Sequence, residues 1–113
     1  IQTNLINFSY KYKVNKIIFI ASCCIYPREC PQPMKEENLL SGPLEPSNEG
    51  YALAKIAGIK ICQSYFKQYS LKSFCPMPIN LYGPNDNFHP DNNHIIPGLI
   101  NRLHKTKINN DKY

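Results

Sequence analysis

The sequence predicts an α/β fold in which helices pack on a parallel sheet. An amphipathic pattern over residues 1–12 is followed by an apolar run at residues 17–21. This run is continuous rather than alternating, which suits a parallel strand covered on both faces. A second helical pattern at residues 51–69 precedes another apolar run at residues 71–81. Helices that alternate with apolar strands are typical of α/β domains.

The first two elements are one helix and one strand. In residues 1–12 the apolar side chains at positions 1, 5, 6, 8 and 10 stand among polar ones, as in the end of an amphipathic helix. Residues 16–22 are predicted to form the strand, and Ser22 closes it. The serine hydroxyl is therefore expected at the carboxyl end of a buried strand.

Residues 26–48 are predicted to form a long loop. This segment contains five prolines, so neither a long helix nor a central strand can run through it. Loops of this length are often functional, and the apolar and aromatic residues within it favour an ordered loop that lines a site.

The second helix is predicted over residues 51–69. Residues 47–50 read Ser-Asn-Glu-Gly and are expected to cap its start. The side chains expected to face inward are Ala52, Ile56, Ile59 and Cys62.

The last third of the chain contains a strand, a turn and a helix. The strand at residues 71–81 is interrupted by Pro76 and Pro78, which should lie near its ends. Residues 82–87 form a turn cluster. The third helix should open at His94 to Pro97 with Asn92 or Asn93 as its cap, and should end near Lys105.

Composition limits the chain to one domain at most, since 113 residues with 42% apolar content fill one small core. The chain begins with Ile1 rather than methionine, so we expect a piece of a longer protein. Its net charge of +5 comes from scattered lysines and arginines, which argues against nucleic-acid binding. The longest apolar run, residues 17–25, is too short to span a membrane.

The cysteines predict a reduced, cytoplasmic setting. There are five of them, an odd number, and no pair has C-x-x-C spacing. The three histidines stand at none of the usual ligand spacings from these cysteines, so no metal site is predicted.

Tyr51 and Lys55 are the first candidates for chemistry. Residues four apart share one helix face, so the lysine ammonium can lie near the phenol and favour its ionised form. The pair alone is weak, because many helices place a core-edge tyrosine one turn before a solvated lysine. The strand-end hydroxyl of Ser22 strengthens it, since that hydroxyl could hold a carbonyl oxygen while the tyrosine donates a proton.

Several linked motifs follow one another along the chain: Ser22-Cys23-Cys24-Ile25-Tyr26-Pro27, Leu44-Glu45-Pro46, Tyr51-Ala52-Leu53-Ala54-Lys55-Ile56-Ala57-Gly58, Asn80-Leu81-Tyr82-Gly83-Pro84 and Asp86-Asn87-Phe88-His89-Pro90. Together they resemble the motifs of the GDP-L-fucose synthase family, within the extended short-chain dehydrogenases/reductases. The likeness extends over residues 1–107, which we expect to be a partial domain, and residues 108–113 would be a polar tail.

The resemblance implies part of a Rossmann-type, doubly wound parallel sheet, from the centre to the C-terminal portion of the cofactor domain. It also implies a reaction in two stages on GDP-4-keto-6-deoxy-D-mannose. The sugar is epimerised at C3 and C5, and NADPH then reduces the C4 ketone. Both epimerised carbons flank the ketone, so each inversion needs one group to remove a proton and another to return it.

The family pattern also implies residue roles. Cys24 and His94 would be the acid/base pair, whereas Ser22 and Tyr51 would hold the C4 oxygen. Tyr51 would donate the proton that accompanies hydride transfer, and Lys55 would lower the pKa of the tyrosine and bind the nicotinamide ribose. Taken singly, a cysteine can be a core filler and His94 a cap; the set of motifs favours the catalytic roles.

The resemblance further implies NADP(H) as cofactor, a homodimer when the protein is complete, and Arg102 as a residue that meets the substrate nucleotide. The residues expected to contact the cofactor are Ile20, Ala21, Ser22, Cys23, Tyr51, Lys55, Pro78, Ile79, Asn80, Leu81 and His94.

Three positions depart from the family pattern, which commonly has threonine at Ile79, serine at Cys23 and a basic residue at Asn101. The isoleucine puts cofactor affinity in doubt. The five glycines never approach the spacing of a phosphate-binding loop, and the family's substrate region beyond Arg102 is missing. We therefore expect no turnover by residues 1–113 alone.

Two alternatives remain open. One is another nucleotide-sugar epimerase or dehydratase; dehydratases of this class usually have an acidic residue soon after the strand-end hydroxyl, where Cys23 and Cys24 stand here. The other is a catalytically dead product of a split gene.

Overall fold

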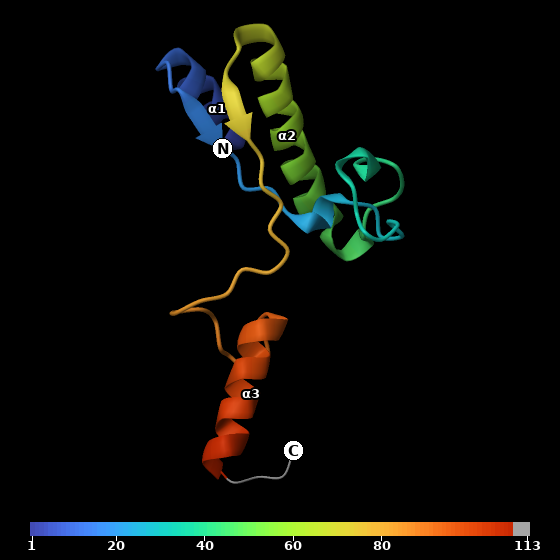
Figure 1. Cartoon of the computed structure of the whole chain (residues 1–113), viewed down its shortest axis with the longest axis vertical. Coiled ribbons are helices and arrows are strands. Elements are labelled where there is room, and N and C mark those ends of the chain that lie inside the picture. The colour runs from blue at the N-terminus through green and yellow to red at the C-terminus, as the bar shows by residue number, and fades with distance from the viewer. Residues whose placement is uncertain (110–113) are drawn as a thin grey trace. The chain divides into compact units, whose positions relative to one another are not determined.

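The computed structural model describes residues 1–109, which fall into two compact units (Figure 1). The N-terminal unit comprises residues 1–79 and the C-terminal unit residues 80–109. Helices α1 (Gln2–Lys11) and α2 (Glu49–Tyr69) belong to the N-terminal unit together with the parallel strands β1 (Lys16–Ile18) and β2 (Lys72–Phe74). The predicted α/β class is confirmed.

Both strands are shorter than the sequence predicted. In place of strands at residues 16–22 and 71–81, each regular strand has three residues. The segments that follow the two strands nevertheless stay paired. The Phe19 N–H donates to the Phe74 carbonyl and the Ala21 N–H donates to the Pro76 carbonyl, both at 2.9 Å. Pro76 has no N–H to donate back, so the regular ladder ends while the strands remain side by side.

The sheet is covered on one face within the N-terminal unit, so the prediction of two covered faces is wrong for this unit. Ile17 points into the core, where it packs with Ile6 of α1 and Cys62 of α2. Its neighbour Ile18 is 63% exposed and Phe74 of β2 is 60% exposed. Successive side chains of a strand point to opposite faces, so the exposed side chains of Ile18 and Phe74 lie on the face opposite the helices.

The core consists of two apolar clusters joined by the ring of Phe19, which packs against both. The inward face predicted for the second helix is confirmed, since its four residues are all buried. Burying one isoleucine side chain contributes about 1.5–3 kcal/mol to the stability of the fold. One cluster contains Ile6, Ile17, Cys62 and Leu71, and the other contains Ala21, Ile25, Ile56 and Ile59.

Helix α2 begins two residues earlier than predicted and without the predicted cap. A short 3₁₀ turn, η3 (Pro46–Asn48), leads directly into the helix. Asn48 occupies the N-cap position, but its side chain makes no capping hydrogen bond. Its own N–H instead donates to the Glu45 carbonyl at 3.0 Å, so the entry is stabilised by the backbone of the turn. The helix ends as predicted, at Tyr69.

Residues 26–48 form the predicted irregular loop. Its regular pieces are η3 and one other 3₁₀ turn, η2 (Glu36–Asn38). Arg28 joins the two ends of the loop: its N–H donates to the Pro43 carbonyl at 3.0 Å, and its Nε lies 3.3 Å from Glu45 Oε2.

The C-terminal unit contains a turn followed by helix α3 (Ile95–Asn109). The Asp86 N–H donates to the Gly83 carbonyl at 3.3 Å, which confirms the turn predicted at residues 82–87. The helix extends four residues beyond the predicted end at Lys105, because no glycine or proline follows to break it. It therefore includes the start of the predicted polar tail, residues 108 and 109, while residues 110–113 lie outside the described residues.

None of the helices in residues 1–109 has the length and apolar character that crossing a membrane would need.

Candidate active site

The predicted residues of the N-terminal unit gather at the carboxyl end of β1. There the chain turns into η1 (Cys23–Ile25), a 3₁₀ turn whose N-cap is Ser22. Ser22 Oγ accepts a hydrogen bond from the Cys24 N–H at 3.3 Å, so the hydroxyl and the thiol belong to one turn. Ser22, Cys23 and Cys24 are half-buried, and the fully buried Ile25 anchors the turn in the core.

Tyr51 and Lys55 lie in the first turns of α2. The Lys55 ammonium donates to the Ile20 carbonyl at 2.7 Å, which ties the helix to the end of β1. The same Nζ lies 5.6 Å from the centroid of the Tyr51 ring. Lys55 is half-buried, while Tyr51 is 49% exposed. Both side chains are therefore on one helix face beside the strand end.

Gly58 brings α2 close to β1, and sequence reasoning missed this role. A Cβ at this position would lie 2.2 Å from Cζ of Phe19, so a larger residue would push the ring or the helix away. The distance between the helix and the strand in turn determines whether the Lys55 ammonium can bond to the Ile20 carbonyl. A glycine inside a good helical pattern, three residues beyond Lys55, was the available signal.

The segments that follow β1 and β2 lie side by side. The Cys23 thiol is 4.0 Å from the Ile79 carbonyl, and the Tyr26 hydroxyl donates to Met77 Sδ at 3.3 Å. Ile79 itself is 72% exposed. Two of the segments predicted to contact the cofactor therefore meet at this edge of the unit.

Burial controls the ionisation of two groups here. It raises the pKa of the Cys23 thiol, and the neighbouring Cys24 raises that pKa further through its charge and a hydrogen bond. Burial also raises the pKa of Tyr26, with smaller contributions from Glu36 and Cys30. Cys23 is thus held as a neutral thiol at neutral pH.

The other predicted residues, Asn80, Leu81, His94 and Arg102, belong to the C-terminal unit. His94 is exposed and comes immediately before α3, where its carbonyl accepts the Gly98 N–H at 3.0 Å. Leu81 is 72% exposed.

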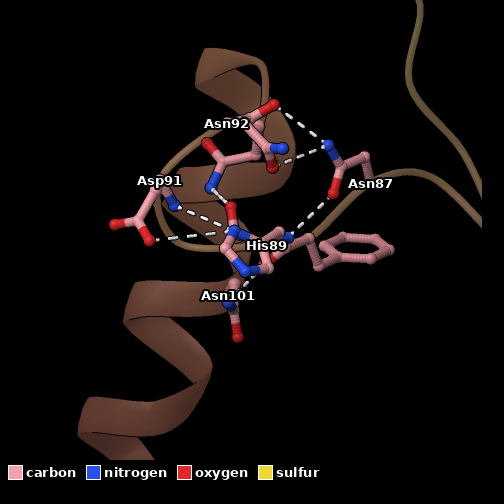
Figure 2. Close-up of polar contacts among 7 residues, drawn as sticks. Asn87, His89, Asp91, Asn92 and Asn101 are labelled. Atoms are coloured by element: carbon pink, nitrogen blue, oxygen red, sulfur yellow. Dashed lines mark hydrogen bonds and ion pairs between the residues drawn. The ribbon is translucent and has the colours of Figure 1, made fainter.

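An asparagine-rich turn precedes His94 and is fixed by its own side chains (Figure 2). Asn87 Oδ1 accepts the His89 N–H at 3.0 Å, and Asn87 Nδ2 donates to the Asn92 carbonyl at 2.9 Å. Asn101, one turn and a half into α3, donates to the Phe88 carbonyl at 2.8 Å. Sequence reasoning treated Asn101 only as a missing basic residue; the structure makes it the link between turn and helix.

Asn92 and Asn93 are the predicted caps of the third helix. Their side chains and backbone instead form hydrogen bonds within this turn. Asn92 accepts from Asn87, and Asn93 donates to the His89 carbonyl. Gly98 makes room for Asn93, because a Cβ there would lie 2.2 Å from Asn93 Oδ1.

Arg102 borders a hollow of about 360 Å³ on the C-terminal unit, together with Asn93 and Lys105. Among residues 1–109, neither cation of this pair takes part in a salt bridge. Two cations beside one hollow suit an anionic group. A separate hollow of about 390 Å³, on the N-terminal unit, contains none of the predicted residues.

Comparison with known proteins supports these assignments of family and fold. The model of the NAD dependent epimerase/dehydratase family matches residues 1–112. A putative GDP-L-fucose synthase 2 from Arabidopsis thaliana is 56% identical over 110 residues, which are 97% of this chain and 34% of that protein.

Solved structures agree. A GDP-L-fucose synthetase from Naegleria fowleri bound to NADP has a TM-score of 0.84 and 31% identity, over 99% of this chain and 37% of that one. A GDP-mannoheptose C4 reductase from Campylobacter jejuni with NADP bound has a TM-score of 0.86 and 36% identity, over 95% and 32% of the two chains. The chain thus spans about a third of the length of the relatives it matches.

Proposed function

Because this chain belongs to the NAD dependent epimerase/dehydratase family, we propose that it is the acid/base portion of a GDP-L-fucose synthase. One observation carries the proposal: Lys55 is bonded to the end of β1 at Ile20, beside Tyr51 and directly before the turn with Ser22 and Cys24. A phenol and an ammonium on α2 and a hydroxyl and a thiol in η1 therefore belong to elements that adjoin the same strand end. The similarity to a GDP-L-fucose synthase over 97% of the chain supports the choice within the family.

The proposed substrate is GDP-4-keto-6-deoxy-D-mannose. Ser22 and Tyr51 would hold the C4 oxygen, which makes the protons on the adjoining C3 and C5 acidic. Cys24 and His94 would then remove and return these protons on opposite faces of the sugar. When the ketone is reduced, Tyr51 would donate the proton to the C4 oxygen. Tyr51 would thus act in both stages of the reaction.

NADP(H) is the proposed cofactor, and it would supply the hydride for C4. The residues present fit its nicotinamide end: Tyr51 and Lys55 offer a phenol and an ammonium to ribose hydroxyls beside an exposed strand end. No glycine in the sequence stands in a phosphate-loop spacing, so this chain does not supply the pyrophosphate cradle. The remaining cofactor contacts would come from Ile20, Ala21, Ser22, Cys23, Pro78, Ile79, Asn80, Leu81 and His94.

Arg102 is the proposed contact to the substrate nucleotide. Its hollow holds a second cation, Lys105, and the wall is fixed by the bond of Asn93 to His89. A diphosphate is the anionic part of a GDP-sugar, so the charge is of the sign the substrate needs. We also propose that the complete protein is a homodimer in the cytoplasm, where its five cysteines, all free thiols, would stay reduced.

A second candidate is a C4 reductase that does not epimerise. The 36% identity to the GDP-mannoheptose C4 reductase supports this second candidate. The two candidates differ in the use of Cys24 and His94, since reduction alone needs Ser22, Tyr51 and Lys55 but no acid/base pair at C3 and C5.

The deciding experiment incubates the complete protein with the keto sugar and NADPH in deuterium oxide. Deuterium at both C3 and C5 of the product would support the synthase, while NADPH oxidation without deuterium would favour the reductase. Cys24→Ser should lower the rate of exchange by about 10²–10⁴-fold, and Cys30→Ser, a half-buried thiol of the loop, should leave it unchanged. A Cys24→Ser variant that exchanges at full rate would refute the role of Cys24.

The 113-residue chain by itself is expected to oxidise no NADPH with this substrate, because a site without its cofactor and nucleotide clamps cannot position the reacting atoms. Measurable oxidation by the isolated chain would overturn this expectation. Absence of turnover even in the complete protein would identify the sequence as part of a dead gene product.

A further inference from the structure

We propose that Cys23 and Cys24 form a dithiol site for monosubstituted trivalent arsenicals, which they hold through two arsenic–sulfur bonds. The proposed reaction gives Cys23 no part in proton transfer, so its thiol is free for another chemistry. The binding itself stands on the geometry of this turn. Only its consequence, loss of epimerisation through capture of Cys24, rests on the proposed function.

The two thiols belong to consecutive residues of one turn, η1. Ser22 caps the turn through the Cys24 N–H at 3.3 Å, and the buried Ile25 fixes its other end in the core. Cys23 and Cys24 are consecutive residues of this turn, so rotation about their side-chain bonds can bring both sulfurs to one bridging atom. Both side chains are half-buried, so a small reagent can reach them. Their pairing is therefore local to this turn.

The spacing of the pair favours a bridging atom over a disulfide. Consecutive Cα atoms are about 3.8 Å apart, whereas disulfides usually join Cα atoms roughly 4.4–6.8 Å apart. A direct bond between Cys23 and Cys24 would consequently be strained, and both sulfurs are free thiols in the structure. An arsenic atom inserted between the sulfurs enlarges the ring and relieves this constraint. Soft thiol ligands are also the class that such a centre prefers.

The step balances without an oxidant. With phenylarsine oxide, two arsenic–sulfur bonds form at Cys23 and Cys24 while the bonding between arsenic and oxygen is broken. The two thiol protons leave with that oxygen as one water molecule. Arsenic remains trivalent, and both sulfurs keep their oxidation state.

The other pair of neighbouring thiols is protected by the core. Cys62, on the buried face of α2, is 1% exposed, and Cys75 packs against its cluster. Burial and the nearby Cys62 raise the pKa of Cys75 to about 11, which keeps it protonated. The folded chain should therefore direct a dithiol reagent to η1 and leave Cys62 and Cys75 unmodified.

The test measures binding of phenylarsine oxide to the whole chain by intact mass, with peptide mapping of the adduct. One phenylarsenic group per folded chain is expected; it should survive excess monothiol and be removed by a dithiol. Cys23→Ser and Cys24→Ser should each weaken binding roughly 100-fold or more, because the second bond is no longer intramolecular. Cys30→Ser and Cys62→Ser are the matched controls and should bind like the parent chain, with folding of every variant checked by circular dichroism.

An adduct mapped to Cys62 and Cys75, or a Cys23→Ser variant with unchanged affinity, would overturn the proposal. The mass readout needs neither substrate nor cofactor, so it is independent of the proposed function. In the complete protein the adduct should abolish deuterium exchange at C3 and C5 until a dithiol is added. Full exchange with the adduct in place would leave the arsenical site standing and refute the role of Cys24 in proton transfer.

Discussion

The two units of the chain are held by different forces. In the N-terminal unit, two clusters of buried apolar residues join α1, α2 and both strands. Among residues 80–109 of the C-terminal unit, the buried ones are Pro97 and Gly98 of α3, and the turn before the helix is fixed by asparagine side chains bonded to backbone groups. Site residues on the first unit are therefore placed by packing, and His94 on the second is placed by a polar turn.

The two kinds of contact contribute different free energies to stability. Burying one large apolar side chain contributes about 1.5–3 kcal/mol, whereas a hydrogen bond contributes a net 0.5–1.5 kcal/mol or so. The turn of Ser22 and Cys24 should consequently tolerate surface changes but not core changes. The geometry around His94 should respond to the loss of single amide groups.

Ile25→Ala is expected to have the largest effect on this comparison. Ile25, the last residue of η1, is fully buried, so its truncation should lower the free energy of unfolding of the N-terminal unit by about 2–5 kcal/mol. Ile18→Ala is the matched control, because Ile18 is 63% exposed and should change stability by about 0.5 kcal/mol or less. Denaturant unfolding followed by circular dichroism measures both. Equal losses of unfolding free energy in the two variants would contradict the inference that apolar packing positions the turn.

Gly58→Ala should have the next largest effect. The added methyl would meet the Phe19 ring at 2.2 Å, so overpacking is expected to cost about 1–3 kcal/mol. Gly50→Ala provides a control of opposite sign, since a Cβ there meets nothing within 4 Å and helix propensity favours alanine by up to about 1 kcal/mol. The same unfolding measurement applies. A Gly58→Ala variant as stable as the parent would show that helix and strand can separate at no cost.

Asn101→Asp tests the polar turn of the C-terminal unit. Aspartate keeps the shape of the side chain but cannot donate to the Phe88 carbonyl, so about 0.5–1.5 kcal/mol of local stability should be lost. Amide hydrogen exchange of residues 87–93 should become faster by up to about tenfold. Asn80→Asp, an exposed asparagine outside this network, should leave those amides unchanged. Unchanged exchange in Asn101→Asp would mean that the turn is held without this bond.

Alkaline pH provides a further test, in the N-terminal unit. The pKa of Cys75 is about 11 in the folded chain against an ordinary value of 9.0, chiefly because of burial. Between these values the unfolded chain has lost the proton that the folded chain keeps, so stability should fall as pH rises from 9 to 11. Unfolding curves at several pH values should show a smaller fall for Cys75→Ala. An equal fall in both chains would assign the alkaline loss to other groups.

Much of the N-terminal unit could be predicted from its sequence. The inward residues of α2 follow from helical spacing, and the irregular loop at residues 26–48 follows from its prolines. Strand lengths were overestimated, because an apolar run reports burial but not where a proline removes a donor from the ladder. The early start of α2 was missed because the 3₁₀ turn before it is stabilised by the backbone rather than by a capping side chain.

The sequence by itself determined which groups are available for chemistry: consecutive Ser22, Cys23 and Cys24 after an apolar run, and Tyr51 with Lys55 one helical turn apart. Only the tertiary structure decided that Lys55 bonds to the Ile20 carbonyl, that Gly58 admits the Phe19 ring and that Asn101 ties the turn to α3. The reason is physical. Spacing along the chain fixes neighbours within one element, whereas contacts between elements depend on how side chains far apart in sequence fill the same space.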